Sequence, residues 1–225
     1  MSLKVIAGIY GSRVLKSVRG LGTRPLLGQV KESVFNILGE RTAGAFVWDL
    51  FAGTGASGIE ALSRGAARVA FVEKNGRAVD VLRDNLRMLG EEAVANSLVL
   101  RADAWDPPVL HRSAFGAARA DAPELPSDAE VAPDLVFLDP PYSMVEEDPV
   151  KSVYRARRLA QRLAPGGCLV FHFPEGMLAE DDFDPDFEVD LREYGSSAIA
   201  FLWRQGEAPS RGRQRREDAR AGGET

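Results

Sequence analysis

The chain has 225 residues, of which 28 are lysine or arginine and 33 are aspartate or glutamate, giving a formal charge of −5 at neutral pH. No apolar run reaches the ~18–20 residues that a membrane span needs, and residues 1–10 lack the long apolar stretch of a signal peptide. A single cysteine, Cys168, excludes an internal disulfide framework and a multi-cysteine zinc site, so a cytoplasmic protein is expected.

The charge is distributed unevenly along the chain. Residues 1–41 contain seven bases and two acids, and residues 204–225 contain six arginines and four acids, which leaves a net charge of −12 on residues 42–203. We therefore expect a basic N-terminal extension over 1–41 and an acidic domain over 42–204. Residues 113–133 are rich in Ala, Pro and Asp and predict an irregular insertion, and residues 205–225 predict a disordered tail.

The N-terminal extension reads as a small hairpin followed by a helix. Two short strands are expected over residues 4–10 and 13–16, a loop over 20–25, and a helix over 25–38, where Val30, Val34 and Leu38 recur at helical spacing. Arg13, Lys16, Arg19 and Arg24 lie in this glycine-rich segment. With Lys4 they predict a surface that contacts RNA phosphates, which would position RNA without reading its sequence.

Strands and helices alternate through the rest of the chain. Strands are expected over 45–50, 68–72, 97–100, 135–138 and 168–173, and helices from the glycines after residue 50 to about 64, over 76–89 and over 149–163. Residues 187–191 and 198–203 follow with no helix between them, which predicts an antiparallel edge hairpin. The order predicts an α/β fold with a doubly wound, Rossmann-like sheet that is mostly parallel.

A glycine-rich turn follows the first strand of the acidic domain. Gly53, Gly55 and Gly58 have the G-x-G-x-x-G spacing, which lets the backbone turn sharply and approach a ligand. That spacing alone is also typical of a purely structural turn. Glu73 ends the next strand, 20 positions after Gly53, where a carboxylate can accept hydrogen bonds from ribose hydroxyls.

Acidic residues end four successive strands of the predicted sheet: Asp49, Glu73, Asp103 and Asp139. Ligands of open α/β sheets bind at the carboxyl ends of the strands, so these side chains are expected to converge on one crevice. Carboxylates repel phosphates and attract cations. They therefore favour S-adenosylmethionine, which carries a sulfonium and no phosphate, over NAD, which carries a pyrophosphate.

The tetrapeptide Asp139-Pro140-Pro141-Tyr142 follows a buried strand. Prolines have no N–H group and a fixed φ, so their carbonyls can point outward. We expect Asp139 and the Pro140 carbonyl to hold the hydrogens of an exocyclic amine on a nucleobase, and Tyr142 to stack on a base extracted from its helix.

Other chemistries have less support in the sequence. His111 and His172 are far apart and have no Cys/His/Asp ligand pattern, so no metal site is expected. Cys168 lies in a predicted buried strand, and without a cysteine near Asp139 a cytosine-C5 methyltransferase is excluded. Trp48 and Trp105 are interpreted as packing residues, and no G-x-S-x-G nucleophile motif is present.

The motifs together resemble the class I S-adenosylmethionine-dependent methyltransferases that act on exocyclic amines. Within them, the chain is similar to the RsmD family, bacterial enzymes that modify guanine N2 in small-subunit (16S) ribosomal RNA. DLFAGTGASGIE, FVEKN and DPPY carry the class resemblance, and GLGTRP with VKESVFNILG carries the family resemblance, which extends over residues 4–203. The chain departs from the family pattern at Leu26–Gln29 and in the long insertion at 113–133.

The resemblance implies specific roles for individual residues. The cofactor would be bound by Asp49, Phe51, Gly53, Thr54, Gly55, Glu73, Lys74, Asp103 and Ala104, and the catalytic residues would be Asp139, Pro140, Pro141 and Tyr142. The implied partner is ribosomal RNA or the small ribosomal subunit. Two alternatives remain: an amino-methyltransferase acting on adenine N6 or cytosine N4 in DNA or RNA, and an RNA-binding module without catalysis.

Overall fold

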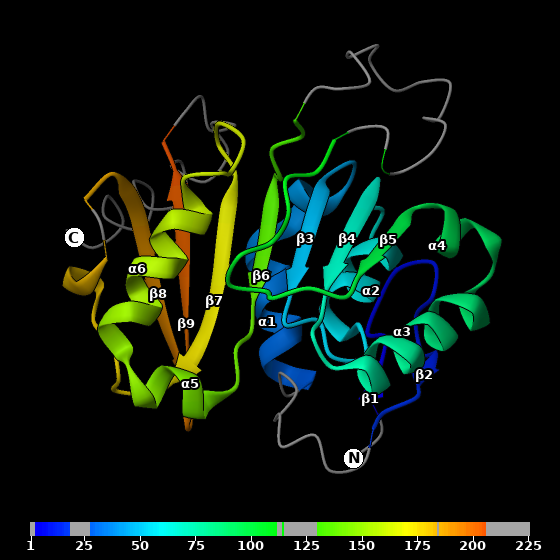
Figure 1. Cartoon of the computed structure of the whole chain (residues 1–225), viewed down its shortest axis with the longest axis horizontal. Helices are drawn as coiled ribbons and strands as arrows, with labels where there is room; N and C mark the ends of the chain where they lie inside the picture. The colour runs from blue at the N-terminus through cyan, green and yellow to red at the C-terminus, as the bar shows by residue number, and fades with distance from the viewer. Residues whose placement is uncertain (1–2, 19–27, 112–113, 115–129, 184, 206–225) are drawn as a thin grey trace, which may run out of the picture.

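The structure of the protein is a computed structural model that describes residues 3–18, 28–111, 114, 130–183 and 185–205. A seven-stranded sheet runs through its centre in the order β5-β4-β3-β6-β7-β9-β8 (Figure 1). Its strands are β3 (Phe46–Leu50), β4 (Arg68–Val72), β5 (Ser97–Leu100), β6 (Leu135–Leu138), β7 (Cys168–Pro174), β8 (Phe187–Tyr194) and β9 (Ser197–Arg204). The first five of these pair in parallel, and β9 is antiparallel to both β7 and β8. The predicted doubly wound sheet with an antiparallel edge hairpin is confirmed.

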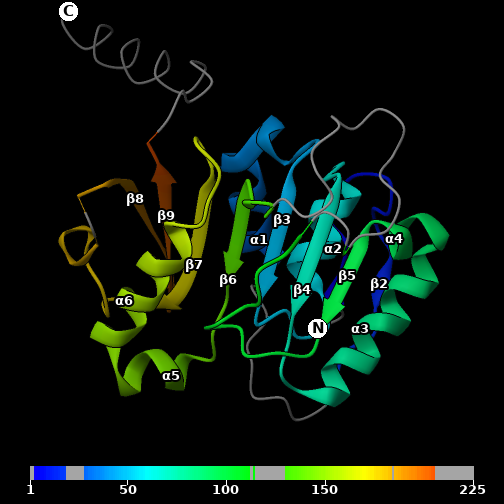
Figure 2. The ribbon, with the colours of Figure 1, turned by 45° about the horizontal axis from the view of Figure 1, so that its top comes forward.

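Helices cover both faces of this sheet. On one face lie α1 (Gly28–Leu38), α2 (Ala56–Ser63) and α3 (Gly76–Leu89), and on the other lies α6 (Pro149–Ala160), preceded by the short α5 (Tyr142–Glu147). Successive residues of β3 alternate between the two apolar clusters, and all five are buried, as expected of a central parallel strand. In both views α5 and α6 lie towards the β7–β8 side of the molecule, and α3 and α4 (Glu91–Ala95) lie at the β5 side (Figure 1, Figure 2).

The N-terminal hairpin is shorter than its sequence predicts. Its strands β1 (Leu3–Lys4) and β2 (Val14–Leu15) have two residues each, because the chain leaves the ladder after Val5. The next two amides, those of Ile6 and Ala7, donate to the carboxylate of Glu60 in α2, at 2.7 and 3.1 Å. The buried carboxylate of Glu60 thus accepts the two hydrogen bonds that the carbonyl groups of a partner strand would otherwise accept.

Further differences concern short elements and element ends. The predicted helix over 149–163 ends at Ala160, and α4 and α5 have too few residues to show a clear helical period. β5 ends at Leu100, so Asp103 lies in the following loop rather than at the strand end. Most of the predicted insertion at 113–133 and nearly all of the predicted tail at 205–225 lie outside the described residues. Within the described part of the chain, no helix is long and apolar enough to cross a bilayer.

Candidate active site

The order of the strands places both signature motifs at one point of the sheet. From β3 the chain proceeds to β4 and β5 on one side, and it then returns to β6 on the other side of β3. Ligands of open α/β sheets bind at the carboxyl ends of the strands where the order reverses in this way. The glycine-rich turn follows β3 and the Asp-Pro-Pro-Tyr segment follows β6, so the topology brings them together.

The glycine-rich turn has a left-handed backbone at three positions. The φ angles of Phe51, Gly53 and Gly55 are 58°, 54° and 89°, and Gly55 is the N-cap of α2. For a phenylalanine this conformation costs on the order of 1–3 kcal/mol, and such outliers cluster at functional sites. The ring of Phe51 contacts that of Trp105 edge to face, with centroids 5.2 Å apart.

Glu73 fastens the turn to the end of β4. One carboxylate oxygen accepts a hydrogen bond from the Gly53 amide at 2.9 Å, and the other accepts one from the Asn75 amide at 2.7 Å. A carboxylate offers about four acceptor positions, so roughly two remain for a ligand. On the far side of the turn, the side-chain amide of Asn85 donates to the carbonyl of Thr54 at 3.0 Å.

A cavity of about 770 Å³ lies between this turn and the helices that follow β6. It is lined by six of the predicted cofactor residues and by Pro141, together with residues that the sequence did not indicate: Asn75, Ala78, Trp105, Met144, Glu147, Asp148, Lys151, Ser152 and Arg155. Trp105 packs, as predicted, but it also faces the cavity, and its place two residues after Asp103 could have signalled this. The residues from α5 were missed because that helix was not predicted, and those from α6 were missed because the predicted helix over 149–163 carried no sign that it faces the cavity.

The lining carries both signs of charge: acids predicted at the strand ends are accompanied by bases, of which the sequence indicated only Lys74. The acids Glu73, Asp103, Glu147 and Asp148 face the bases Lys74, Lys151 and Arg155. Lys74 lies 3.8 Å from Asp103, but both side chains are exposed, so this pair adds little stability. A ligand of this cavity is therefore expected to combine positive and negative groups with apolar surface.

Asp49 is not part of the cavity lining. Its side chain points to the α2 side of the sheet, where it is 2% exposed and accepts a hydrogen bond from the Gly58 amide at 2.8 Å. Burial raises the pKa of Asp49 to about 8, because an ionised carboxylate loses its hydration there. A Cβ on Gly58 would lie 2.3 Å from the ring of Phe71 and 2.9 Å from Asp49, so only glycine fits. Asp49 therefore stabilises the first turn of α2 by accepting the hydrogen bond of the Gly58 amide.

Asp139 follows β6 directly and its side chain is 25% exposed. Its Oδ1 atom lies 2.6 Å from Nδ1 of His172. The carbonyl of Pro141 accepts a hydrogen bond from the Met144 amide at 2.9 Å, whereas no described residue donates to the carbonyl of Pro140. The Pro140 carbonyl and the second oxygen of Asp139 are thus the acceptors that this turn offers.

Tyr142 is held by its hydroxyl. The oxygen lies 2.8 Å from Nε2 of His172 and 2.6 Å from Oγ of Ser197. The sequence did not indicate His172 or Ser197, since their partners are 30 or more positions away in the chain. His172, which has no ligand pattern around it in the sequence, is the residue that links Asp139 to Tyr142.

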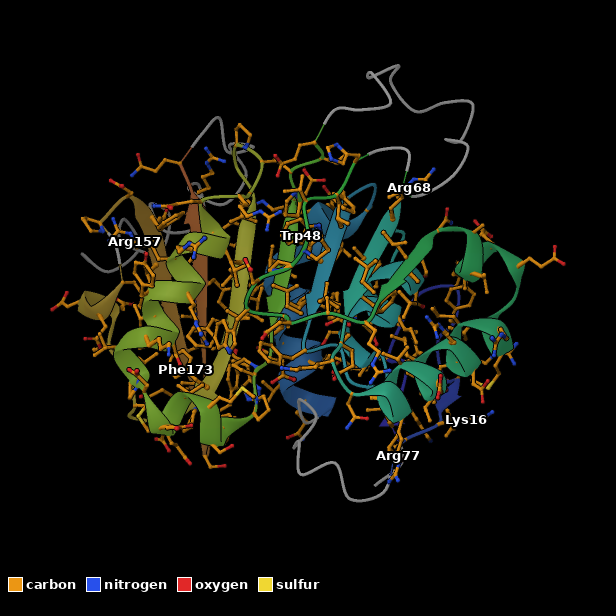
Figure 3. The ribbon with its side chains drawn as sticks, viewed as in Figure 1. Lys16, Trp48, Arg68, Arg77, Arg157 and Phe173 are labelled. Atoms are coloured by element: carbon orange, nitrogen blue, oxygen red, sulfur yellow. The ribbon has the colours of Figure 1, made fainter. Side chains whose placement is uncertain are left out.

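The predicted RNA-binding residues are only partly described. Lys4, Arg13 and Lys16 are exposed on and beside the N-terminal hairpin, whereas Arg19 and Arg24 lie outside the described residues. Lys16 lies beside α3 (Figure 3), where its ammonium group is 3.1 Å from the carboxylate of Asp84. Among the described residues, no group of three or more His, Cys, Asp or Glu side chains is arranged to hold a metal ion.

Comparison with known proteins gives a consistent result. Residues 3–203 match the family described as "Conserved hypothetical protein 95". A "Putative rRNA methyltransferase YlbH" from Bacillus subtilis is 36% identical over 204 residues, which are 91% of this chain and 100% of that protein. A "Ribosomal RNA small subunit methyltransferase D" from Haemophilus influenzae is 31% identical over 62% of this chain and 64% of its own.

Solved structures share the fold. A "Putative methyltransferase yhhF" from Escherichia coli superposes with a TM-score of 0.67 at 24% identity, covering 92% of this chain and 100% of its own. An RNA methyltransferase from Salinibacter ruber, solved in complex with S-adenosyl-L-homocysteine, superposes with a TM-score of 0.52 at 16% identity, covering 83% of this chain and 97% of its own. The chain therefore shares its fold with both of these structures.

Proposed function

This chain belongs to the family described as conserved hypothetical protein 95, as its resemblance to RsmD predicted, and from that premise we propose that it transfers a methyl group from S-adenosylmethionine to the N2 amine of a guanine in small-subunit ribosomal RNA. The relatives named as methyltransferases of ribosomal RNA, and of its small subunit in particular, support the class of substrate. Because ribosomal RNA is made in the bacterial cytoplasm, the enzyme is expected there.

One observation carries the proposal. The cavity has Glu73 and Asp103 on one wall and Pro141 of the Asp-Pro-Pro-Tyr segment on the other. Asp139 and Pro140 directly precede Pro141, so a cofactor held by the first wall would lie close to the groups that we propose to hold the amine. Methyl transfer needs this juxtaposition, because donor and acceptor atoms must approach to about 3–3.5 Å.

The cavity residues suit S-adenosylmethionine chemically. Glu73 has acceptor capacity left for ribose hydroxyls, and Asp103 lies in the loop beyond β5 beside the buried Ala104. Phe51 and Trp105 supply aromatic surface for a flat base. The mixed charges match a cofactor that carries a sulfonium, an ammonium and a carboxylate. When bound, the cofactor supplies an electrophilic methyl group.

The residues after β6 would prepare the amine. An exocyclic amine is a poor nucleophile, because its lone pair is delocalised into the ring. Two acceptors on its hydrogens, the Asp139 carboxylate and the Pro140 carbonyl, oppose that delocalisation and aim the nitrogen at the methyl group. The amine becomes acidic once it is methylated, so its proton can leave after the transfer and no strong base is needed beforehand. Tyr142 would stack on the guanine that has been turned out of its helix.

The test is methyl transfer with a labelled donor. The full chain is incubated with labelled S-adenosylmethionine and with 16S RNA, small ribosomal subunits or duplex DNA. We expect label in RNA or subunits, and a loss of about 10²-fold or more in kcat for Asp139→Ala, with cofactor binding retained. Glu193→Ala, an exposed site on β8, is the matched control and should match the wild type. Label in DNA alone, or full turnover by Asp139→Ala, would refute the proposal.

A further inference from the structure

A buried histidine connects two residues of the catalytic segment. His172, in β7, is 3% exposed and forms hydrogen bonds with Asp139 on one side of its ring and with Tyr142 on the other. We propose that His172 is a positioning residue for methyl transfer, which aims the free oxygen of Asp139 at the target amine and fixes the ring of Tyr142. This inference rests on the proposed function and extends it to a residue outside the Asp-Pro-Pro-Tyr segment.

The pairing of the strands brings these groups together. Leu138 of β6 pairs with Phe171 of β7, so the next residues along the two parallel strands, Asp139 and His172, are neighbours. β9 lies on the other side of β7 and contributes Ser197, which is 7% exposed. Tyr142 opens α5 and reaches back to both. Side chains from four elements thus form one hydrogen-bonded network.

Donor and acceptor chemistry fixes the direction of each bond for a neutral imidazole. An ionised Asp139 can only accept, so Nδ1 of His172 must carry the proton and donate over 2.6 Å. Nε2 is then without a proton and accepts from the Tyr142 hydroxyl over 2.8 Å. The hydroxyl of Ser197 donates in turn to the Tyr142 oxygen over 2.6 Å. Every polar atom of the ring is satisfied, and Oδ2 of Asp139 remains for the substrate.

Any buried imidazole needs hydrogen-bond partners, and the informative point is which residues supply them to His172. The buried residues of β7 on the same face as His172 include Cys168 and Val170, which belong to the apolar cluster. His172 instead contacts two members of the segment proposed to hold the base. A hydrogen bond between buried groups is costly to lose, so each contact restricts the rotation of its partner. A displacement of about 1 Å at a reacting group can lower a rate by roughly 10²-fold.

Two conservative variants separate the two contacts. The side-chain amide of His172→Asn can replace Nδ1 as the donor to Asp139 but does not reach Tyr142, whereas that of His172→Gln can replace Nε2 as the acceptor from Tyr142. We expect His172→Ala to lower kcat by about 10²-fold. His172→Asn should recover most of kcat while raising KM for RNA. His172→Gln should keep a KM for RNA close to that of the wild type while its kcat stays low. Cys168→Ala, equally buried in the same strand, is the matched control for packing.

The variants are compared with the wild type in methyl transfer to RNA, in cofactor binding by calorimetry and in thermal unfolding. Unchanged kcat and KM in His172→Ala would overturn the inference. The inference would also be overturned if His172→Ala lost activity together with cofactor affinity and had a lower Tm, while His172→Asn and His172→Gln restored neither kcat nor KM.

A readout that does not depend on activity separates this inference from the proposed function. The chain has two histidines, so the imidazole nitrogens of His172 can be assigned in ¹⁵N spectra by comparison with His172→Asn. We expect Nδ1 of His172 to carry a proton, because it donates to the Asp139 carboxylate. An Nδ1 without a proton would overturn the inference even if the enzyme methylates RNA. A wild type that methylates no RNA would overturn the proposed function, whatever the spectrum shows.

Discussion

At the residue scale, two carboxylates stabilise the glycine-rich turn and the helix that follows it. Glu73 faces the cavity and holds the turn through the Gly53 amide, whereas Asp49 lies under α2 and is buried against Gly58. The sequence marks both as acids near strand ends, but only the pleat of β3 decides which face of the sheet Asp49 occupies. Side-chain direction, rather than position in the motif, separates the acid that faces the cavity from the acid that is buried beneath α2.

The buried Asp49 predicts a pH-dependent stability. The pKa of this carboxyl is about 8 in the folded protein and near 3.8 in the unfolded chain, so folding favours its protonated form. The stability that it contributes is complete below about pH 4 and is lost as the pH rises towards 8, by up to about 1.4 kcal/mol per pH unit. Asp49→Asn should remove this loss and be more stable than the wild type at pH 8. Urea unfolding at pH 5 and pH 8 measures the difference, and parallel pH profiles would contradict it.

At the element scale, Glu60 joins three segments. Its carboxylate accepts from the amides of Ile6 and Ala7, lies 3.0 Å from the Lys31 ammonium of α1, and lies 2.9 Å from the Arg64 guanidinium at the end of α2. Both Glu60 and Lys31 are almost completely buried. The N-terminal residues are thereby attached to the sheet domain, and Val5 and Leu15 share its apolar cluster.

Removing Glu60 should destabilise the fold strongly. Glu60→Ala leaves the Lys31 ammonium buried without its partner, and we expect the free energy of unfolding to fall by about 3–5 kcal/mol. Urea unfolding measures this loss, and Glu188→Ala, an exposed glutamate in β8, serves as the control, with an expected change within about 0.5 kcal/mol. A loss of less than about 1 kcal/mol in Glu60→Ala would show that the pair does not hold the N-terminal segment.

The wild type should also lose stability in acid through this group. Burial alone would raise the pKa of Glu60, but the Ile6 amide and the Lys31 and Arg64 cations outweigh it, so the pKa lies below its usual range. A lowered pKa stabilises the fold above the ordinary value of 4.5, and that contribution disappears as the pH falls below it. The stability difference between the wild type and Glu60→Ala should therefore narrow from pH 6 to pH 3, and a constant difference would contradict this.

Elements with a clear period were predictable, and short ones were not. The predicted bounds of β4, β5, β6 and α3 match the structure, because apolar strands and a 14-residue amphipathic helix carry strong local patterns. α5 has six residues and follows two prolines, so it shows almost no period. The site residues His172 and Ser197 depend on strand pairing over more than 30 positions, which composition and spacing do not report.

At the scale of the whole molecule, the charge of −5 is the sum of an acidic domain and a basic N-terminal extension. The acidic domain contains the cavity, and the N-terminal hairpin of β1 and β2 lies beside α3, at the other side of the sheet from β8 (Figure 1, Figure 2). Binding to RNA through phosphates releases counterions, so affinity falls with salt in proportion to the number of phosphates that the protein neutralises. The distribution of charge, rather than its sum, is therefore the relevant quantity.

Removing positive charges from the N-terminal extension tests whether it binds RNA phosphates. Arg13→Ala with Lys16→Ala should weaken RNA binding and reduce the slope of log K against log salt by about 1 for each phosphate that is no longer neutralised, while cofactor affinity stays unchanged. Arg192→Ala in β8, where the arginine is paired with Asp190, is the control at the opposite edge of the sheet. An unchanged slope in the double variant, measured from low to physiological salt, would refute an RNA-binding role for these two residues.

The most direct measurement is the chemical identity of the methylated nucleoside. Small-subunit RNA, free or in subunits and lacking the modification, is treated with the full chain and labelled S-adenosylmethionine, digested, and resolved by chromatography with mass spectrometry. We expect the label to appear in N2-methylguanosine and to disappear with Asp139→Ala. Label in N6-methyladenosine or N4-methylcytidine would contradict it.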